Sequence, residues 1–257
     1  MTRRGWTREE LLIALKIYCE LEFGQFHSHH PRIIEVSQAL DRTPGSLAMK
    51  LCNFASLDPA MKGKGLKGAS KADREVMSTF LSEPEKIIYE SELAYADLWK
   101  DKRYDGFHEP QSLFDFDYQM TRDTESTATV KTRTYQNFFR KTVISSYKFN
   151  CAVCSINVPE LLIASHIIPW AQDKNLRLLP TNGIALCASH DKAFDRGLFT
   201  LKDNYSILLS SEIEERQDNE YVDLLFMKFS ERRLNMPFRF MPDKACVAWH
   251  RDNIFRH

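Results

Sequence analysis

The chain has 257 residues, of which 43% are hydrophobic and 27% are charged, so it has the composition of a folded globular protein and not of a disordered tail. No apolar run approaches the roughly 18 residues of a membrane-spanning helix. The net charge is zero, but residues 1–81 carry +3, residues 82–130 carry −7 and residues 131–257 carry +4. Because two basic segments flank an acidic one, the neutral total does not exclude a nucleic-acid partner.

The first ten residues, MTRRGWTREE, contain no apolar stretch of the kind found in a secretory signal. We therefore expect a cytoplasmic protein without a membrane partner. In that compartment six cysteines are more typical of metal ligands or buried thiols than of a disulfide framework.

Residues 1–81 predict a helical module that binds DNA. A capping box at Thr7 starts a helix of about residues 8–21, Pro31 starts a second, and Thr43 followed by Pro44 starts a third. The last two helices and their tight turn fit helix-turn-helix geometry. On the third helix a polar stripe at i, i+4 and i+7 predicts an outward, DNA-contacting face formed by Ser46, Lys50 and Asn53. A plain helical hairpin is the alternative.

Residues 82–130 form an acidic, partly helical connector, and the Ser/Thr-rich part from Gln119 to Lys131 reads as a linker. Two hypotheses follow for this segment. It could cover a basic surface and restrain the activity of its neighbours, or it could be a solvated connector, which we favour. The domain boundary is expected near residues 120–130.

Residues 131–257 contain the strongest motif. A helix over residues 132–150, with Arg133 and Arg140 as possible DNA contacts, precedes two pairs of metal ligands. Cys151 and Cys154 form one x2-spaced pair, and Cys187 and His190 form the other. Two such pairs match a closed tetrahedral zinc site, although some of these cysteines could be ordinary buried thiols.

Between and after these pairs, the pattern is strand, loop, strand and short helix. The run LLIASHII predicts the first strand, and IAL after Asn182-Gly183 predicts the second. The segment ASHDKAFDRG then predicts a helix closed by Gly197, and LFTLKDNYSILL predicts a hairpin around Asp203-Asn204.

This region resembles HNH endonucleases, most closely the restriction and phage-defence members whose core reads SHI-x-PW, NG and HD-x-AFDRG. Here those motifs are Ser165-His166-Ile167, Pro169-Trp170, Asn182-Gly183 and His190 to Gly197. The resemblance implies a ββα-metal fold that hydrolyses phosphodiesters with a divalent ion, Mg²⁺ or Mn²⁺. A histidine whose pKa is near neutrality suits activation of water, so His166 is the candidate base. The resemblance implies that Asn182 bonds across the two strands and fixes His166.

The chain departs from many HNH proteins at two places. The residue before the base histidine, often a metal ligand, is Ser165. Many members also place the third motif residue nine positions after the asparagine, which is Asp191 and not His190. We favour His190 as a zinc ligand, with Asp191 and Asp195, one helical turn apart, facing the catalytic ion. In the alternative, His190 holds the catalytic ion and the zinc site has three cysteines. Separately, Asp195 could be a structural cap or an ion-pair partner instead of a ligand.

We therefore expect an α+β protein with an N-terminal helical module and a C-terminal ββα-metal nuclease domain. Its expected function is metal-dependent cleavage or nicking of double-stranded DNA in restriction or phage defence, with Zn²⁺ as a structural ion. Partners could be a second copy or other proteins of a defence system. The alternatives are a non-catalytic, zinc-containing DNA-binding regulator and an RNA-processing nuclease.

Overall fold

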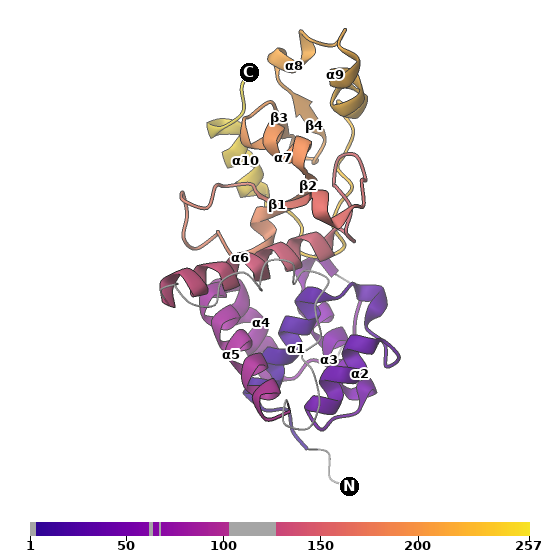
Figure 1. Ribbon diagram of the computed structural model, residues 1–257, viewed down its shortest axis with the longest axis vertical. Helices are drawn as coiled ribbons and strands as arrows, with labels where there is room; N and C mark the ends of the chain where they lie inside the picture. Colours follow the sequence, from indigo (N-terminus) through magenta and orange to yellow (C-terminus); the bar gives the residue numbers. More distant parts are fainter. Residues whose placement is uncertain (1–3, 62–63, 67, 103–126) are drawn as a thin grey trace. The chain divides into compact units, whose positions relative to one another are not determined.

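The computed structural model describes residues 4–61, 64–66, 68–102 and 127–257. They divide into two compact units, and the division falls between Lys141 and Thr142, inside helix α6 (Thr127–Ser146; Figure 1). Most of the expected linker, and the hypothesis that it restrains activity, lie outside the described residues. No described helix is long and apolar enough to cross a membrane.

The first unit is helical, and its helices begin where the sequence predicts. Thr7 caps α1 in a capping box, Thr43 accepts a hydrogen bond from the Ser46 N–H at the start of α3, and Ser70 caps α4 in a second capping box. The helices of this unit before α6 are α1 (Arg8–Glu20), α2 (Pro31–Ala39), α3 (Pro44–Leu57), α4 (Lys71–Ser82) and α5 (Pro84–Lys102), with short turns η1 (Phe23–Gln25) and η2 (Pro59–Met61).

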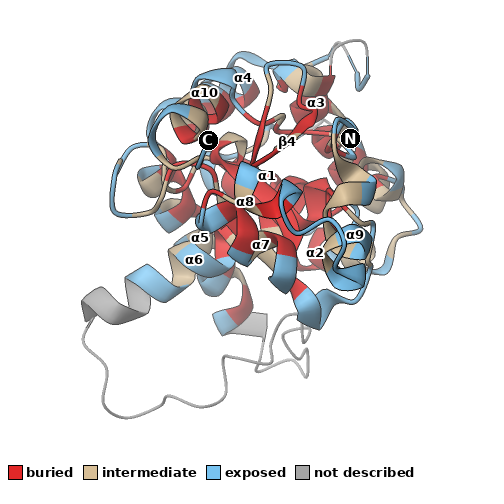
Figure 2. Cartoon of the chain, turned by 90° about the horizontal axis from the view of Figure 1, so that it is seen from above, coloured by how far each residue is buried: buried red, intermediate tan, exposed pale blue. Residues whose placement is uncertain are grey.

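Helix α1 lies at the centre of this unit and packs against α3, α4 and α5. It is buried along most of its length, as its red colour in Figure 2 shows. Two acids of the acidic segment belong to this packing, because Glu90 and Glu92 on α5 pair with Arg8 and Lys16 on α1. The helical part of the acidic segment is therefore part of the first unit.

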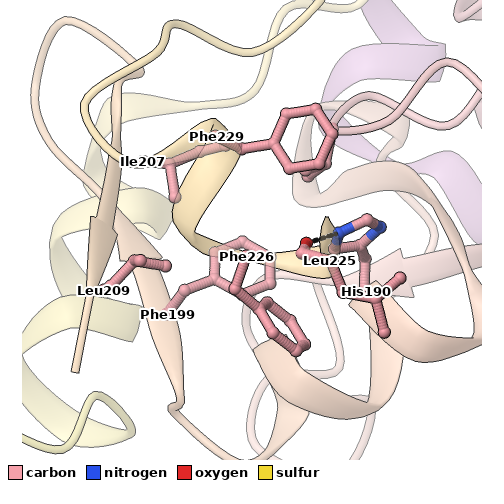
Figure 3. A pocket seen from close by; sticks show the side chains of 8 residues that line it. His190, Phe199, Ile207, Leu209, Leu225, Phe226 and Phe229 are labelled. Carbon is pink, nitrogen blue, oxygen red and sulfur yellow. Dashed lines mark hydrogen bonds between the residues drawn. The ribbon is translucent and has the colours of Figure 1, made fainter. Parts of the chain in front are cut away.

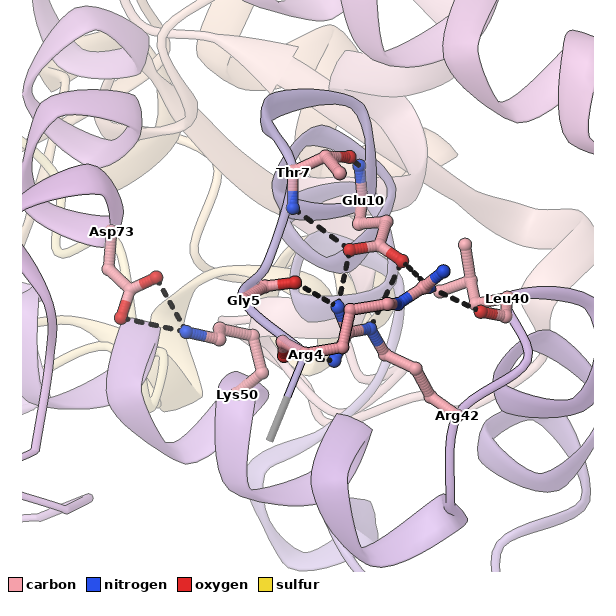
Figure 4. Close-up of polar contacts among 8 residues, drawn as sticks. All are labelled: Arg4, Gly5, Thr7, Glu10, Leu40, Arg42, Lys50 and Asp73. Carbon is pink, nitrogen blue, oxygen red and sulfur yellow. Dashed lines mark hydrogen bonds and ion pairs between the residues drawn. The ribbon is translucent and has the colours of Figure 1, made fainter. Parts of the chain in front are cut away.

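The expectation that α3 presents an outward polar stripe is wrong for Lys50 and Asn53. Lys50 is buried, and its Nζ lies 2.8 and 3.0 Å from the two carboxylate oxygens of the fully buried Asp73 on α4 (Figure 4). Asn53 is also buried, and Ser46 is half-buried. The physical reason is that α4 covers the polar face of α3, so that both faces of this helix are used for packing.

The second unit begins within α6 and contains two small antiparallel sheets. Strands β1 (Leu162–His166) and β2 (Gly183–Cys187) pair so that His166 lies opposite Gly183 and Leu162 opposite Cys187. Helix α7 (Ala188–Asp195) packs against both. The predicted hairpin is β3 (Phe199–Leu201) with β4 (Ile207–Leu209). The remaining elements are α8 (Ser211–Glu214), α9 (Glu220–Leu225), α10 (Lys244–Asn253) and the short turns η5 (Pro159–Leu161), η6 (Pro180–Asn182) and η7 (Met227–Phe229).

Gly197 ends α7, as the sequence predicts. Its φ is +69°, and the N–H groups of Gly197 and Leu198 donate to the carbonyls of Phe194 and Ala193. This pair of bonds is a Schellman motif, which requires a left-handed residue that glycine adopts at little cost. The turn sends the chain directly from α7 into β3.

Candidate metal centre and nuclease site

Four side chains of the second unit converge on one point. The ligand atoms of Cys151, Cys154, Cys187 and His190 all lie within 4.8 Å of one another. The sulfurs of Cys154 and Cys187 are 3.9 Å apart, and Nδ1 of His190 lies 3.1 Å from the Cys187 sulfur. A tetrahedral zinc ion with Zn–S bonds of about 2.3 Å requires ligand separations of about 3.8 Å. The donor set and its spacing therefore fit zinc.

Backbone bonds hold the first ligand pair in place. Cys151 and Cys154 lie in a turn where the Ser155 N–H donates to the Cys151 carbonyl, and Ser155 has a φ of +60°. The N–H of Ala152 donates to the carbonyl of Ala185 on β2 at 2.7 Å, which ties the turn to the central sheet. Because β2 ends at the third ligand, this bond brings the two pairs together across 32 intervening residues.

The ring of His190 is oriented by a carbonyl that the sequence could not reveal. Its Nε2 lies 2.7 Å from the backbone oxygen of Leu225, as the dashed line in Figure 3 shows. Nε2 must donate in this bond, so in the neutral ring Nδ1 carries the lone pair, and Nδ1 is the atom that faces the cysteines. The rings of Phe199, Phe226 and Phe229 surround the imidazole edge-on, and this enclosure has no room for a water molecule.

The search for clusters of three or more potential metal ligands among the described residues gives these four side chains. The cluster fits the sequence alternative in which His190 is the fourth zinc ligand, and that assignment stays a prediction. Hydrogen bonds from the thiols of Cys151 and Cys154 also hold the pKa of Cys187 well below its ordinary range. A thiolate at this position is the form that binds a metal.

The second candidate site lies where β1 ends. Asn182 clamps the residue that follows the strand: its Oδ1 accepts from the Ile168 N–H at 2.8 Å, and its Nδ2 donates to the Ile168 carbonyl at 3.0 Å. The bridge between the strands that the HNH resemblance implies is therefore present. It holds the backbone two residues after His166 and does not touch the imidazole itself.

A second backbone carbonyl sets the protonation of His166. Its Nε2 lies 2.9 Å from the carbonyl oxygen of Arg177, so this nitrogen donates and Nδ1 carries the lone pair of the neutral ring. The ring also packs edge-on against Trp170, with centroids 5.6 Å apart. Burial lowers the pKa of His166 below its ordinary value of 6.5, and the bond to Arg177 opposes this only in part. A neutral imidazole that can accept a proton is thus favoured at neutral pH.

Helix α7 carries the two carboxylates expected to face the catalytic ion. Burial raises the pKa of Asp191, and burial together with the charge of Asp191 raises the pKa of Asp195. The buried hydroxyl of Ser165 lies near the Asp191 carboxyl without a hydrogen bond of normal geometry. The strand β1 packs against α7, and Asp191 lies near both Ser165 on the strand and Asp195 on its own helix. Two carboxylates that repel each other beside a buried hydroxyl fit the oxygen ligands that Mg²⁺ and Mn²⁺ prefer.

The expected DNA contacts on α6 belong to the first unit. Arg133 is exposed and Arg140 is half-buried. Their contact with DNA stays a prediction, as does the helix-turn-helix reading of α2 and α3.

A comparison with known families gives one match. Residues 151–202 match the model of the HNH endonuclease family. The match contains both pairs of metal ligands, His166, Asn182 and the two carboxylates of α7. A search of curated proteins found none that matches the chain.

Proposed function

Because residues 151–202 form an HNH endonuclease domain, we propose that this protein is a metal-dependent endonuclease that hydrolyses phosphodiester bonds in double-stranded DNA. The observation that carries the proposal is the orientation of His166. Its Nε2 is bound to the Arg177 carbonyl, so Nδ1 is the nitrogen that can accept a proton. The strand that carries this histidine packs against the helix that carries Asp191 and Asp195.

In the proposed reaction, Nδ1 of His166 takes a proton from a water molecule as the water oxygen attacks phosphorus. The Arg177 carbonyl keeps the required tautomer, and the clamp from Asn182 to Ile168 fixes the end of the strand. Burial keeps the ring neutral before the reaction because it disfavours the imidazolium.

The carboxylates of Asp191 and Asp195 would hold the catalytic Mg²⁺ or Mn²⁺. When bound, such an ion supplies positive charge to the phosphate and to the leaving oxygen. The four-ligand centre would hold Zn²⁺ in a structural role, because four protein ligands leave a tetrahedral ion no open position for water or substrate.

The resemblance to restriction and phage-defence nucleases supports DNA as the substrate and defence as the role. One ββα unit cuts one strand, so double-strand cleavage by this protein requires a second copy or a second binding event. A homodimer is therefore part of the proposal for double-strand cutting, and a monomer is expected to nick.

The test is cleavage of supercoiled plasmid by the full-length, zinc-loaded protein with Mg²⁺, with Mn²⁺ or with a chelator. Nicked or linear product that requires the ion is expected, and His166→Ala should form it about 10²- to 10⁴-fold more slowly. His29→Ala, which replaces an exposed histidine of the first unit, is the matched control and should cut like the unmodified protein. Cleavage of RNA alone would assign an RNA nuclease. DNA binding without cleavage of either substrate would assign a regulator and overturn the proposal.

A further inference from the structure

A cavity of about 190 Å³ lies beside the cysteine centre, on residues that the family match does not include. Its polar lining consists of Arg232, Arg233, Asn235 and Ser155, and Cys154 forms part of its wall. The arginines come from the segment after η7, about thirty residues beyond the end of the HNH match. No sequence motif pointed to this place.

Backbone bonds fix the arginine segment on both sides of the cavity. The carbonyl of Arg232 accepts from the Ile207 N–H at 2.9 Å, and Arg233 forms a β-bridge with Ser206 in the hairpin. The N–H of Asn235 donates to the Ala152 carbonyl at 2.8 Å, within the cysteine turn. The two guanidinium groups therefore project from a backbone that is already ordered, which lowers the entropic cost of binding a ligand.

The charges at this cavity are not neutralised by the protein. Among the described residues, Arg232 and Arg233 have no carboxylate partner, and no carboxylate lines the cavity. The neighbouring acid, Glu231, is instead paired with Lys202 at 2.6 Å. By contrast, Arg251 pairs with Asp203.

A hydroxyl donor stands beside these two cations. Nδ2 of Asn235 donates to Oγ of Ser155 at 3.0 Å, so the Ser155 oxygen is an acceptor in that bond and its own O–H can donate to a ligand. Two guanidinium groups and a hydroxyl donor around one small cavity match the oxygens of a phosphate group.

We propose that this cavity binds a backbone phosphate of the nucleic acid, at a position separate from the cutting site, through Arg232 and Arg233. The inference rests on the proposed function in that it takes nucleic acid as the substrate. In the alternative explanation, the two arginines serve only the metal centre. A zinc ion with three thiolates and one imidazole carries a net negative charge, and two arginines beside Cys154 would neutralise it.

The test uses full-length protein with His166→Ala, which keeps the DNA intact, and compares it with the same protein carrying Arg232→Gln and Arg233→Gln. The dissociation constant for a labelled duplex is measured at several salt concentrations without divalent ions, and zinc content is measured on each sample. We expect 10- to 100-fold weaker binding and a slope of log K against log salt that is smaller by about 1, since each neutralised phosphate contributes about 0.9. Arg216→Gln, an exposed arginine of α8's C-terminal turn, is the control and should change neither quantity by as much.

Unchanged binding and slope, or no binding of the duplex by the parent protein, would overturn the proposal. Loss of zinc from the double variant would also overturn it and assign the arginines to the metal centre. A second arm titrates inorganic phosphate by calorimetry: saturation by phosphate with no effect of the arginines on duplex binding would assign a free-anion site instead. Because the readout is binding, weaker duplex binding by the variant supports the cavity even if the unmodified protein proves unable to cut.

Discussion

Nδ1 of His190 lies 3.1 Å from Sγ of Cys187, three residues earlier at the start of the same helix. Burial opposes a charged imidazole, but hydrogen bonds with Cys154 and Cys187 outweigh it and raise the pKa of His190 to about 10. A metal ion that binds at Nδ1 must therefore displace a proton.

The first prediction concerns zinc. Protein purified without added metal should contain about one zinc per chain by elemental analysis, because the four ligands already stand at zinc spacing. Cys151→Ser should lose the ion together with the solubility and cooperative unfolding of the second unit, since metal binding contributes folding free energy. Cys246→Ala, which truncates a buried cysteine of the same unit outside the cluster, should keep its zinc. A zinc-free but well-folded Cys151→Ser protein would contradict the structural role.

The second prediction concerns the carboxylate pair. Each of Asp191 and Asp195 has a raised pKa, so the ionised pair is unfavourable until a cation binds. Mn²⁺ should therefore raise the Tm of the zinc-loaded protein by a few degrees. Asp195→Asn should have an equal or higher Tm without Mn²⁺, no further rise with it, and no cleavage. Asp252→Asn, at an exposed position on α10, should keep the Mn²⁺ effect. An Asp195→Asn protein that still gains stability from Mn²⁺ would place the ion elsewhere.

The third prediction concerns the pH dependence of cleavage. A general base works only when it is unprotonated, and burial lowers the pKa of His166 from 6.5. The value of kcat/KM should accordingly be constant above about pH 6.5 and fall as pH decreases through a pKa below that value. His166→Ala should lower activity by about 10²- to 10⁴-fold. A profile that still rises above pH 7.5 would mean that a different group accepts the proton.

Local signals in the sequence were sufficient to predict where several helices of the fold begin or end. Caps at Thr7, Thr43 and Ser70, and the glycine at 197, are local features, and the structure confirms each of them. The spacing of the four metal ligands is local within each pair, so their convergence could also be predicted.

The features that the sequence did not predict depend on contacts distant in the chain. Lys50 reads as a surface residue until α4 places Asp73 against it. The carbonyls of Leu225 and Arg177, which orient the two functional histidines, leave no mark in the sequence because every residue has a carbonyl. The cavity at Arg232 likewise requires the hairpin and the cysteine turn to meet.

The fourth prediction concerns the end of α7. A Cβ on Gly197 would lie 2.0 Å from the carbonyl oxygen of Ile254, and the φ of +69° is itself unfavourable for alanine. Gly197→Ala should therefore destabilise the second unit by about 2–4 kcal/mol. Left-handed strain accounts for about 1–2 kcal/mol of this cost, and displacement of the C-terminal backbone accounts for the rest. Gly24→Ala, where nothing lies within 4 Å, should change stability by less than about 0.5 kcal/mol. Equal unfolding midpoints in urea for the two variants would contradict this account.

The last prediction concerns His250, which stacks on Phe194 with centroids 3.7 Å apart. Its Nε2 donates to the Phe194 carbonyl at 3.1 Å, so Nδ1 accepts from the hydroxyl of Thr200 at 2.9 Å, and this second bond requires the neutral ring. Burial lowers the pKa of His250 from 6.5 to about 4. Since the unfolded chain binds this proton at higher pH than the folded chain, the stabilisation is complete above about pH 6.5 and is lost as pH falls toward 4. Between pH 8 and pH 5 the loss of unfolding free energy should be about 2 kcal/mol.

The test is the variant His250→Gln, whose side chain does not titrate between pH 5 and pH 8. The difference in unfolding free energy between this variant and the unmodified protein should therefore shrink by about 2 kcal/mol from pH 8 to pH 5. A difference that is constant with pH would show that His250 is not held neutral.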